Sequence, residues 1–428
     1  MNELPELHAA GGEQADPPSV GHGCPWLAAM AAGQPLAFPI PRTKPLDPPA
    51  EYAGLRAETP FLKVRLWDGK EAWLVSRYEH FRAILSDPRF SADITRPNYP
   101  TISAGMGVAR GKYRSLISMD PPEHTVQRRM IAGEFTIKRI ESMRPRLQAI
   151  VDDLIDRMLA RGGPADLVAD FALPFPSLAI CELLGVPYAD HDFFQSRARI
   201  LVAHTTTTEQ ANAATVELCD YLRSLIREKD RNPTDDILSR LVVQRVRTGA
   251  MSEEELVGLS RFLLVAGHET TANMTAMGAH LLMQHPEQRQ ELRDEPELMP
   301  QAVEELLRYL DVTHLGRRRV ATEDVRLGDH LIRVGEGVVV LSVSANRDED
   351  VFERPDEFDI HREARHHVTF GYGVHQCLGQ PLARVELQIA LGTLIRRMPG
   401  LRLASPMESL HFNEDMFIYG LRALPVQW

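Results

Sequence analysis

Cysteine is scarce in this chain of 428 residues, which has only four: Cys24, Cys181, Cys219 and Cys377. So few cysteines, with no Cys-x-x-Cys motif, argue against a disulfide framework and indicate a reducing compartment. No apolar run approaches the roughly 18 residues of a membrane-spanning helix. The N-terminus also lacks the basic and apolar regions of a secretory signal. We therefore expect a cytoplasmic protein that does not enter a membrane.

Positive charge is also in deficit. The chain has 48 Lys and Arg against 59 Asp and Glu, which gives a net charge of −11. Nucleic-acid binding generally requires a basic surface, so we expect no nucleic-acid partner. Hydrophobic residues make up 44% and charged residues 25%, which excludes a disordered or collagen-like chain.

Helical periodicity dominates the chain after residues 1–37, a segment rich in Gly, Pro, Ala and Glu that we expect to be a flexible tail. Apolar residues over 147–159 follow the i, i+3, i+4 spacing of a helix. A longer helix is predicted from Ser252, which forms a capping box with Glu255, to Pro286. The middle of this helix is apolar nearly all round, so we expect it to be buried.

Strands are few and short. A further helix is expected over residues 381–397. The absence of alternating βα units predicts a mainly α fold with small β-hairpins, organised as a single domain over residues 38–428. Two strand pairs are expected, residues 62–66 with 72–75 around Asp68-Gly69, and residues 331–334 with 338–341 around Gly335-Glu336-Gly337.

The segment Phe370 to Gly379 reads FGYGVHQCLG and places three glycines around Cys377. Glycines allow the backbone to turn tightly and to approach a large flat ligand. Because a helix follows, we expect its positive end to lower the pKa of the thiol. The amides of Leu378, Gly379 and Gln380 are expected to face the sulfur. A thiolate held in this way is a suitable axial ligand for heme iron.

This loop resembles the heme-binding loop of the cytochrome P450 superfamily, Phe-x-x-Gly-x-x-x-Cys-x-Gly. The resemblance covers about residue 38 to Trp428 and is strongest to the soluble actinomycete hydroxylases of vitamin D, sulfonylureas and statins. It implies the cytochrome P450 fold, with a long central helix over heme b (iron protoporphyrin IX) and Cys377 as the iron ligand. It also implies that further loop residues contact the heme: Phe370, Gly371, Gly373, His375 and Gly379.

A second motif, AGHETT over residues 266–271, lies in the middle of the long helix. Burying a carboxylate and hydroxyls is costly unless they are paired or functional. Thr270 follows Ala266 by four residues, so its hydroxyl is expected to bond that carbonyl and loosen the helix. A satisfied polar kink is the alternative. The family resemblance implies an oxygen-binding groove, with Ala266 and Gly267 against the heme and with Glu269 and Thr270 delivering protons for oxygen activation.

Two familiar motifs are excluded. His268-Glu269 begins the zinc-protease pattern HExxH, but Ala272 occupies the position of the second His. Gly371 and Gly373 begin a dinucleotide-binding pattern, but Gln376 replaces its third glycine and no βαβ unit surrounds it.

Two sets of charged residues complete the pattern. Glu305 and Arg308 are neighbours on one helix face, and the resemblance implies a buried structural pair joined by Arg362, with His361 as the alternative partner. His124 and Arg128 also share a helix face. The resemblance implies that four cationic residues bind the two heme propionates through charge-assisted bonds: His124, Arg128, Arg319 and His375.

No nucleotide or flavin motif is present, so the resemblance implies a ferredoxin and a ferredoxin reductase as electron donors. Arg128, Arg129 and Arg384 are expected on the docking face. The expected activity is that of a monomeric heme-thiolate monooxygenase, which inserts one oxygen atom from O2 into a lipophilic sterol, statin, macrolide or xenobiotic. By family analogy, five segments line its substrate pocket: residues 101–108, 201–202, 265–266, 313–315 and 416–418.

Three alternatives remain open. Residues 47–52 and the hairpin after them resemble fungal nitric oxide reductases of the same fold, but those enzymes lack the acid-threonine pair of Glu269 and Thr270. A non-catalytic heme sensor needs the cysteine loop without that pair. A metal site without heme would use three histidines with the loop cysteine: His361, His366, His367 and Cys377.

Overall fold

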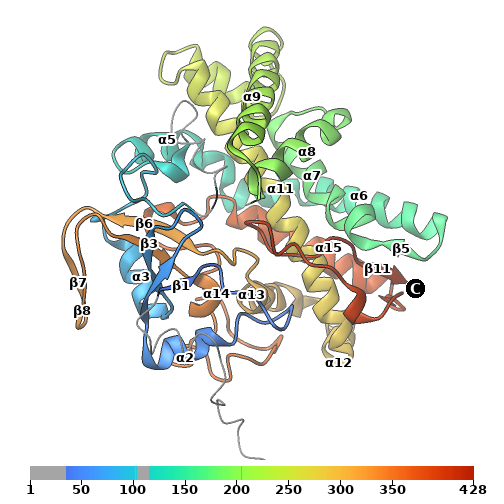
Figure 1. Ribbon diagram of the computed structural model, residues 1–428. Helices are drawn as coiled ribbons and strands as arrows, with labels where there is room; N and C mark the ends of the chain where they lie inside the picture. The colour runs from blue at the N-terminus through green and yellow to red at the C-terminus, as the bar shows by residue number, and fades with distance from the viewer. Residues whose placement is uncertain (1–34, 102, 104–114, 204) are drawn as a thin grey trace, which may run out of the picture. The chain divides into compact units, whose positions relative to one another are not determined.

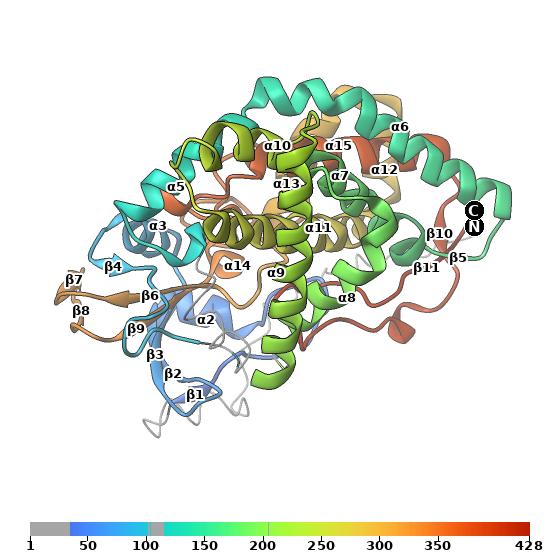
Figure 2. The same ribbon diagram turned by 90° about the horizontal axis from the view of Figure 1, so that it is seen from above.

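The long helix α11 (Glu253–Gln284) is central to the computed structural model, which describes residues 35–101, 103, 115–203 and 205–428. The hydroxyl of Ser252 accepts from the amide of Glu255, whose carboxylate accepts from the amide of Ser252. This capping box confirms the predicted start of the helix. α11 packs against α7, α9 and α15, and Figure 2 shows α9 crossing it.

The chain divides into two compact units, Met1–Leu36 and Ala37–Trp428. Residues 1–34 of the first unit, which include Cys24, lie outside the described residues. The expected flexibility of the N-terminal tail therefore stays a prediction. In the second unit helices dominate, and small sheets gather beside them (Figure 1). The expected mainly α fold with small sheets is confirmed. Within the described residues, no helix combines the length and apolar character needed to cross a bilayer.

The helices of the second unit include those predicted from periodicity. α6 ends where Gly162 takes a positive φ of 79°, and α15 begins one residue before the predicted Pro381. The α-helices are α2 (Glu51–Glu58), α3 (Tyr78–Ser86), α5 (Glu123–Ile131), α6 (Ile137–Arg161), α7 (Pro174–Leu184), α8 (His191–Val202), α9 (Thr208–Arg231), α10 (Ile237–Leu241), α11, α12 (Pro286–Asp294), α13 (Met299–Leu310), α14 (Ser342–Ala345) and α15 (Gln380–Arg397). Short 3-10 or π turns are η1 (Leu116–Ser118), η2 (Ala132–Phe135), η3 (Val168–Ala172), η4 (Tyr188–Asp190), η5 (Val242–Val246), η6 (Pro296–Leu298), η7 (Gly373–His375) and η8 (Met407–Ser409).

The strands of the described residues form three sheets. The largest has the order β1-β2-β3-β9-β6-β4, a second has the order β10-β11-β5, and β7 pairs with β8 alone. The strands are β1 (Leu36–Ala37), β2 (Phe61–Arg65), β3 (Glu71–Val75), β4 (Phe90–Ser91), β5 (Ala165–Asp166), β6 (Arg317–Ala321), β7 (Val325–Leu327), β8 (His330–Ile332), β9 (Gly337–Val340), β10 (Arg402–Leu403) and β11 (Pro425–Gln427).

One of the two predicted strand pairs is correct. β2 and β3 are antiparallel, with Phe61 opposite Val75, as the Asp-Gly turn predicts. The pairing predicted around Gly335 is wrong: β8 pairs with β7, whereas β9 lies between β3 and β6. Every residue of β9 is buried. β9 is therefore a central strand, paired on one edge with β3 and on the other with β6, and neither edge is left for β8.

Two large apolar cores hold these elements together in the described part of the chain. The larger packs side chains of α6, α7, α9, α11, α13 and α15 together. A second core lies between α3 and the largest sheet, and includes Phe81, Val338 and Val340. The segment that carries Cys377 runs from the second core to the start of α15, so both cores position it.

Candidate active site

The cysteine loop is held in a tight backbone conformation. The amide of Cys377 donates to the carbonyl oxygen of Phe370 at 2.8 Å. Gly371 and Gly373 have φ values of 76° and 70°, which only glycine adopts without strain. A Cβ on Gly373 would also overlap the carbonyl oxygen of Leu85, at the end of α3. The glycine pattern therefore reflects both turn geometry and close contact with α3.

The Cys377 sulfur receives hydrogen bonds from the amides of Gly379 and Gln380, two of the three predicted donors. The thiol is accessible at its surface, yet the surrounding protein excludes enough water that burial raises its pKa. The amides and the guanidinium groups of Arg317 and Arg128 act in the opposite direction. The amides at the helix end thus lower the thiol pKa as expected, but desolvation by burial outweighs them.

Arg317 is a residue of this site that the sequence reasoning missed. Its Nη1 donates to the Ser342 hydroxyl at 2.6 Å, and its Nη2 donates to the carbonyl oxygen of Thr369. Burial lowers the pKa of Arg317, and the neighbouring Cys377 raises it. The run of three arginines over residues 317–319 was the available signal, but only Arg319 was selected from it.

Four residues, His124, Arg128, Arg319 and His375, form a group that we call the cationic cluster. The rings of His124 and His375 lie 4.1 Å apart between centroids. Burial, followed by repulsion from Arg319, His124 and Arg128, lowers the pKa of His375 to about 3. Burial and then repulsion from Arg128 and Arg319 also lower the pKa of His124. The structure thus brings together all four residues that the resemblance assigned to the propionates.

Polar atoms of the cationic cluster lack partners. Both ring nitrogens of His124 and Nδ1 of His375 are buried without a hydrogen bond. Arg319 is buried, and its Nη1 donates to the carbonyl oxygen of Arg318 at 2.7 Å. Arg128 instead donates to the carbonyl oxygen of Gln376 at 2.7 Å. Buried donors without acceptors are costly, so the cluster suits an anionic ligand.

These residues fit a heme. The porphyrin carries two carboxylates, for which the cationic cluster would supply donors, and its iron binds a thiolate, which Cys377 would supply. Gly371 and Gly373 have no side chains, so the backbone of the cysteine loop can come close to a flat ligand. The ring of Phe370 lies 4.7 Å from the guanidinium carbon of Arg384.

The middle of α11 has one face that is not closed by packing. Ala266 is exposed there, and Glu269 and Thr270 are half-buried, although the helix is otherwise largely buried. The Thr270 hydroxyl donates to the carbonyl oxygen of Ala266 at 3.0 Å, as predicted. Gly267 points elsewhere, since a Cβ there would lie 2.8 Å from Ile180 Cδ1 of α7. Its contact with a cofactor stays a prediction.

Segments expected to line the substrate pocket meet at the loop of residues 413–421, which we call the C-terminal loop. The Phe417 amide donates to the carbonyl oxygen of Val202 at 2.8 Å. Nε2 of His314 lies 2.8 Å from the carbonyl oxygen of Met416. A Cβ on Gly420 would overlap Oδ1 of Asn273, one turn after Glu269. Of the segment 101–108, only residues 101 and 103 are described, and both are buried.

The predicted buried ion pair is present. Arg308 donates through Nε and Nη2 to both carboxylate oxygens of Glu305, at 2.6 and 2.8 Å, and both side chains are fully buried. Arg362 Nε donates to Glu305 at 3.2 Å. His361 lies instead 2.9 Å from Glu291 on α12. Arg362 is therefore the third member, and His361 is not.

The alternative of a metal site without heme is contradicted by the positions of its histidines. His361 is paired with Glu291, His366 stacks on Phe352, and His367 lies 3.3 Å from Glu304. Across the described part of the chain, no group of three or more His, Cys, Asp or Glu is arranged to hold a metal ion. Burial acts to raise the pKa of Glu304, but His367 and Arg384 hold it at about 2.

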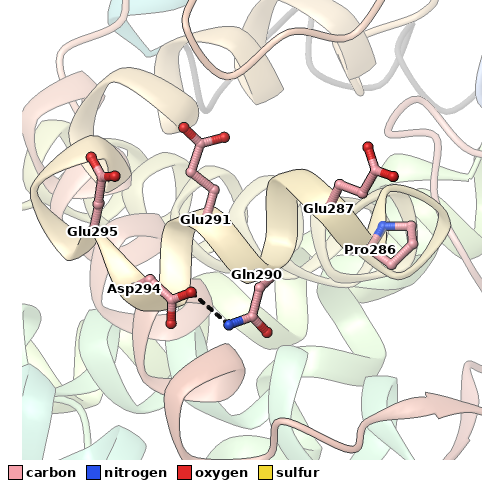
Figure 3. Close-up of a pocket in the computed structure, with 6 residues that line it drawn as sticks. All are labelled: Pro286, Glu287, Gln290, Glu291, Asp294 and Glu295. Atoms are coloured by element: carbon pink, nitrogen blue, oxygen red, sulfur yellow. Dashed lines mark hydrogen bonds between the residues drawn. The ribbon is translucent and has the colours of Figure 1, made fainter.

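A surface hollow on α12 offers no alternative site. Figure 3 shows its acidic side chains fanned along the helix, with Gln290 bonded to Asp294 at 2.7 Å. Glu291 is engaged by His361. The lining residues are Pro286, Glu287, Gln290, Glu291, Asp294 and Glu295.

Comparison with known proteins gives concordant results. The family model for cytochrome P450 matches residues 188–399. Cytochrome P450-SU2 of Streptomyces griseolus is 50% identical over 94% of this chain and 99% of its own. Vitamin D3 dihydroxylase of the same organism is 47% identical over 92% and 97%. The crystal structure of mycinamicin VIII C21 methyl hydroxylase from Micromonospora griseorubida, bound to mycinamicin VIII, is 45% identical. It superposes with a TM-score of 0.88 over 92% of this chain and all of that chain.

Proposed function

Because this chain belongs to the cytochrome P450 family and is a monooxygenase that hydroxylates small molecules, we propose that its cofactor is heme b bound through Cys377. The observation that carries this proposal is the convergence on one loop of a thiol with two amide donors and a cationic cluster with unsatisfied nitrogens. His124, Arg128, Arg319 and His375 hold the propionates.

The protein provides position, protons and exclusion of water, while the heme supplies the redox chemistry that activates O2. With heme bound, the thiolate of Cys377 would donate electron density to the iron. The Thr270 hydroxyl donates a hydrogen bond to the Ala266 carbonyl oxygen, so its own lone pairs are free to accept a hydrogen bond from water or from a neighbouring donor. Glu269, one residue earlier and half-buried, is the group that resupplies protons to this face of α11.

Electrons come from a ferredoxin and its reductase, since the chain has no nucleotide or flavin motif. Arg129 is exposed on α5, next to Arg128, and gives the docking face a free charge. Arg384 contributes less, because Glu304 accepts its Nε and Nη2 bonds at 2.6 and 3.0 Å.

The substrate is a lipophilic molecule with a few oxygens, of the sterol, statin, macrolide or xenobiotic class. The half-buried Phe417 and the exposed Ala266 supply apolar surface. His314 and the buried Thr101 and Ser103 supply polar groups.

The test is the carbon monoxide difference spectrum of the reduced holoenzyme. Wild-type protein should show the red-shifted Soret band of thiolate-ligated heme, and Cys377→Ala should lose it. Cys219→Ala, a matched change at a buried cysteine on α9, should keep the band. A wild-type band typical of histidine ligation, or an unchanged band in Cys377→Ala, would overturn the proposal.

A further inference from the structure

Arg318 lies on β6 between Arg317 and Arg319, whose side chains face the Cys377 side of the sheet. The side chain of Arg318 faces the opposite side. Successive side chains of a strand point to opposite faces. Arg317 bonds the cysteine loop and Arg319 belongs to the cationic cluster, so Arg318 occupies the other face. Its partner across β9 is Val339. Arg318 is therefore not a propionate ligand.

The guanidinium of Arg318 is buried without a counter-ion. The residue is 8% exposed, and its Nε and Nη1 are enclosed without a hydrogen bond. Among the described residues no carboxylate pairs with it, whereas Arg308 and Arg347, which are also buried, each bind an acid. The guanidinium instead lies over the ring of Phe417, with Cζ 5.0 Å from the ring centroid. That contact recovers little of the cost of burying a charge.

The surroundings of Arg318 belong to the expected substrate pocket. Phe417 is held by Val202 at the end of α8, and the adjacent Met416 is held by His314. The same loop reaches α11 through Gly420. The unpaired guanidinium of Arg318 and the aromatic ring of Phe417 thus lie side by side where three segments expected to line the pocket meet.

We propose that Arg318 binds the carboxylate of the molecule that the enzyme oxidises, so that the substrate is a lipophilic acid. The inference rests on the proposed function and narrows its substrate class. A planar guanidinium presents two parallel donors that match a carboxylate. Phe417 packs against the hydrocarbon next to that group, and the molecule extends from there toward the open face of α11.

Calorimetric titration of the ferric holoenzyme with acid and amide pairs of equal shape tests this assignment. The pairs are dodecanoate and dodecanamide, phenylbutanoate and its amide, and adamantane-carboxylate and its amide. In at least one pair the acid should bind about tenfold more tightly than the amide. A tenfold difference in affinity is what one charge-assisted hydrogen bond contributes. Arg318→Gln should abolish this preference and leave amide binding unchanged, and Arg318→Lys should restore part of it.

Arg326→Gln is the matched control, because it removes one positive charge at an exposed position on β7. An acid preference absent from all three wild-type pairs overturns the inference. So does a preference that survives in Arg318→Gln, or one that Arg326→Gln also removes, which would indicate a long-range charge effect. The wild-type comparison stands even if Arg318→Gln fails to fold. A normal carbon monoxide band in the same preparations separates failure of this inference from failure of the heme assignment.

Discussion

The hydroxyl of Thr270 is bonded to the carbonyl oxygen of Ala266, one turn earlier on α11, at 3.0 Å. The bond fixes the side-chain rotamer and directs the oxygen lone pairs to the half-buried face of the helix. A hydroxyl in this arrangement is an acceptor held at a defined place. Both properties of the residue, its bond to the backbone and its free lone pairs, depend on the hydroxyl oxygen, which a substitution of equal shape removes.

Thr270→Val should keep heme binding and helix stability but divert electrons from product to hydrogen peroxide, because it removes the oxygen and keeps the shape. The measurement is the ratio of product to peroxide per electron consumed. Thr270→Ser, which restores the hydroxyl, should recover most of the coupling. Thr275→Val removes a buried hydroxyl one turn further along α11 and should leave coupling unchanged. Full coupling in Thr270→Val would refute the proton role.

Glu305→Gln should destabilise the fold by about 3–5 kcal/mol, because it leaves Arg308 and Arg362 near an uncharged group in a buried site. The urea midpoint of unfolding measures the loss. Glu141→Gln breaks an exposed pair with Arg144 and should cost about 0.5 kcal/mol or less. Equal effects of the two substitutions would show that burial of the first pair does not matter.

Gly373→Ala should lower the heme content of the purified protein, since the added methyl group would overlap the Leu85 carbonyl oxygen and displace the cysteine loop. Gly249→Ala provides the control. Gly249 has a similar φ of 73° but nothing within 4 Å of an added Cβ, so it bears only a conformational cost of about 1–2 kcal/mol. The heme-to-protein ratio distinguishes the two. If both variants bind heme fully, close contact with α3 is not what requires glycine.

Glu386 should make stability depend on pH. Burial raises the pKa of its carboxyl to about 8, above the value of about 4.3 for an exposed glutamate. The folded chain therefore holds this proton more tightly than the unfolded chain, so its contribution is full below pH ~4 and is lost as the pH rises to ~8. The slope approaches about 1.4 kcal/mol per pH unit.

Urea unfolding between pH 5 and 8 measures this dependence. Glu386→Gln, which stays neutral, should flatten the decline, whereas Glu287→Gln at an exposed site on α12 should not. Parallel pH profiles for wild type and Glu386→Gln would contradict the assignment.

Local signals gave the most reliable predictions. The Ser252 capping box, the Asp68-Gly69 turn and the Thr270 spacing each depend on residues a few positions apart, and the structure contains all three features. The family motif supplied the rest of the candidate site, since nothing local indicates that His124 and His375 meet.

Properties set by distant partners could not be predicted. Both neighbours of β9 lie earlier in the chain, β3 far upstream and β6 just before the β7–β8 pair, so the turn at Gly335 was a misleading guide. The thiol pKa depends on how much protein surrounds Cys377, which the following helix does not reveal. The different roles of Arg317, Arg318 and Arg319 follow from the two faces of β6 and from what packs on each.

The small sheet of β10, β11 and β5 has a consequence for the order of folding during synthesis. Val426 pairs with Ala165, and the Leu424 amide donates to Asp166 at 2.8 Å, across 258 residues. Closing so long a loop is slow relative to forming helices. On the ribosome, β5 waits unpaired until the last residues emerge, while α6 and α7 on either side of it are already complete. The C-terminal loop that meets α8 and α11 is delayed for the same reason, so the expected substrate pocket is the last part of the enzyme to take shape.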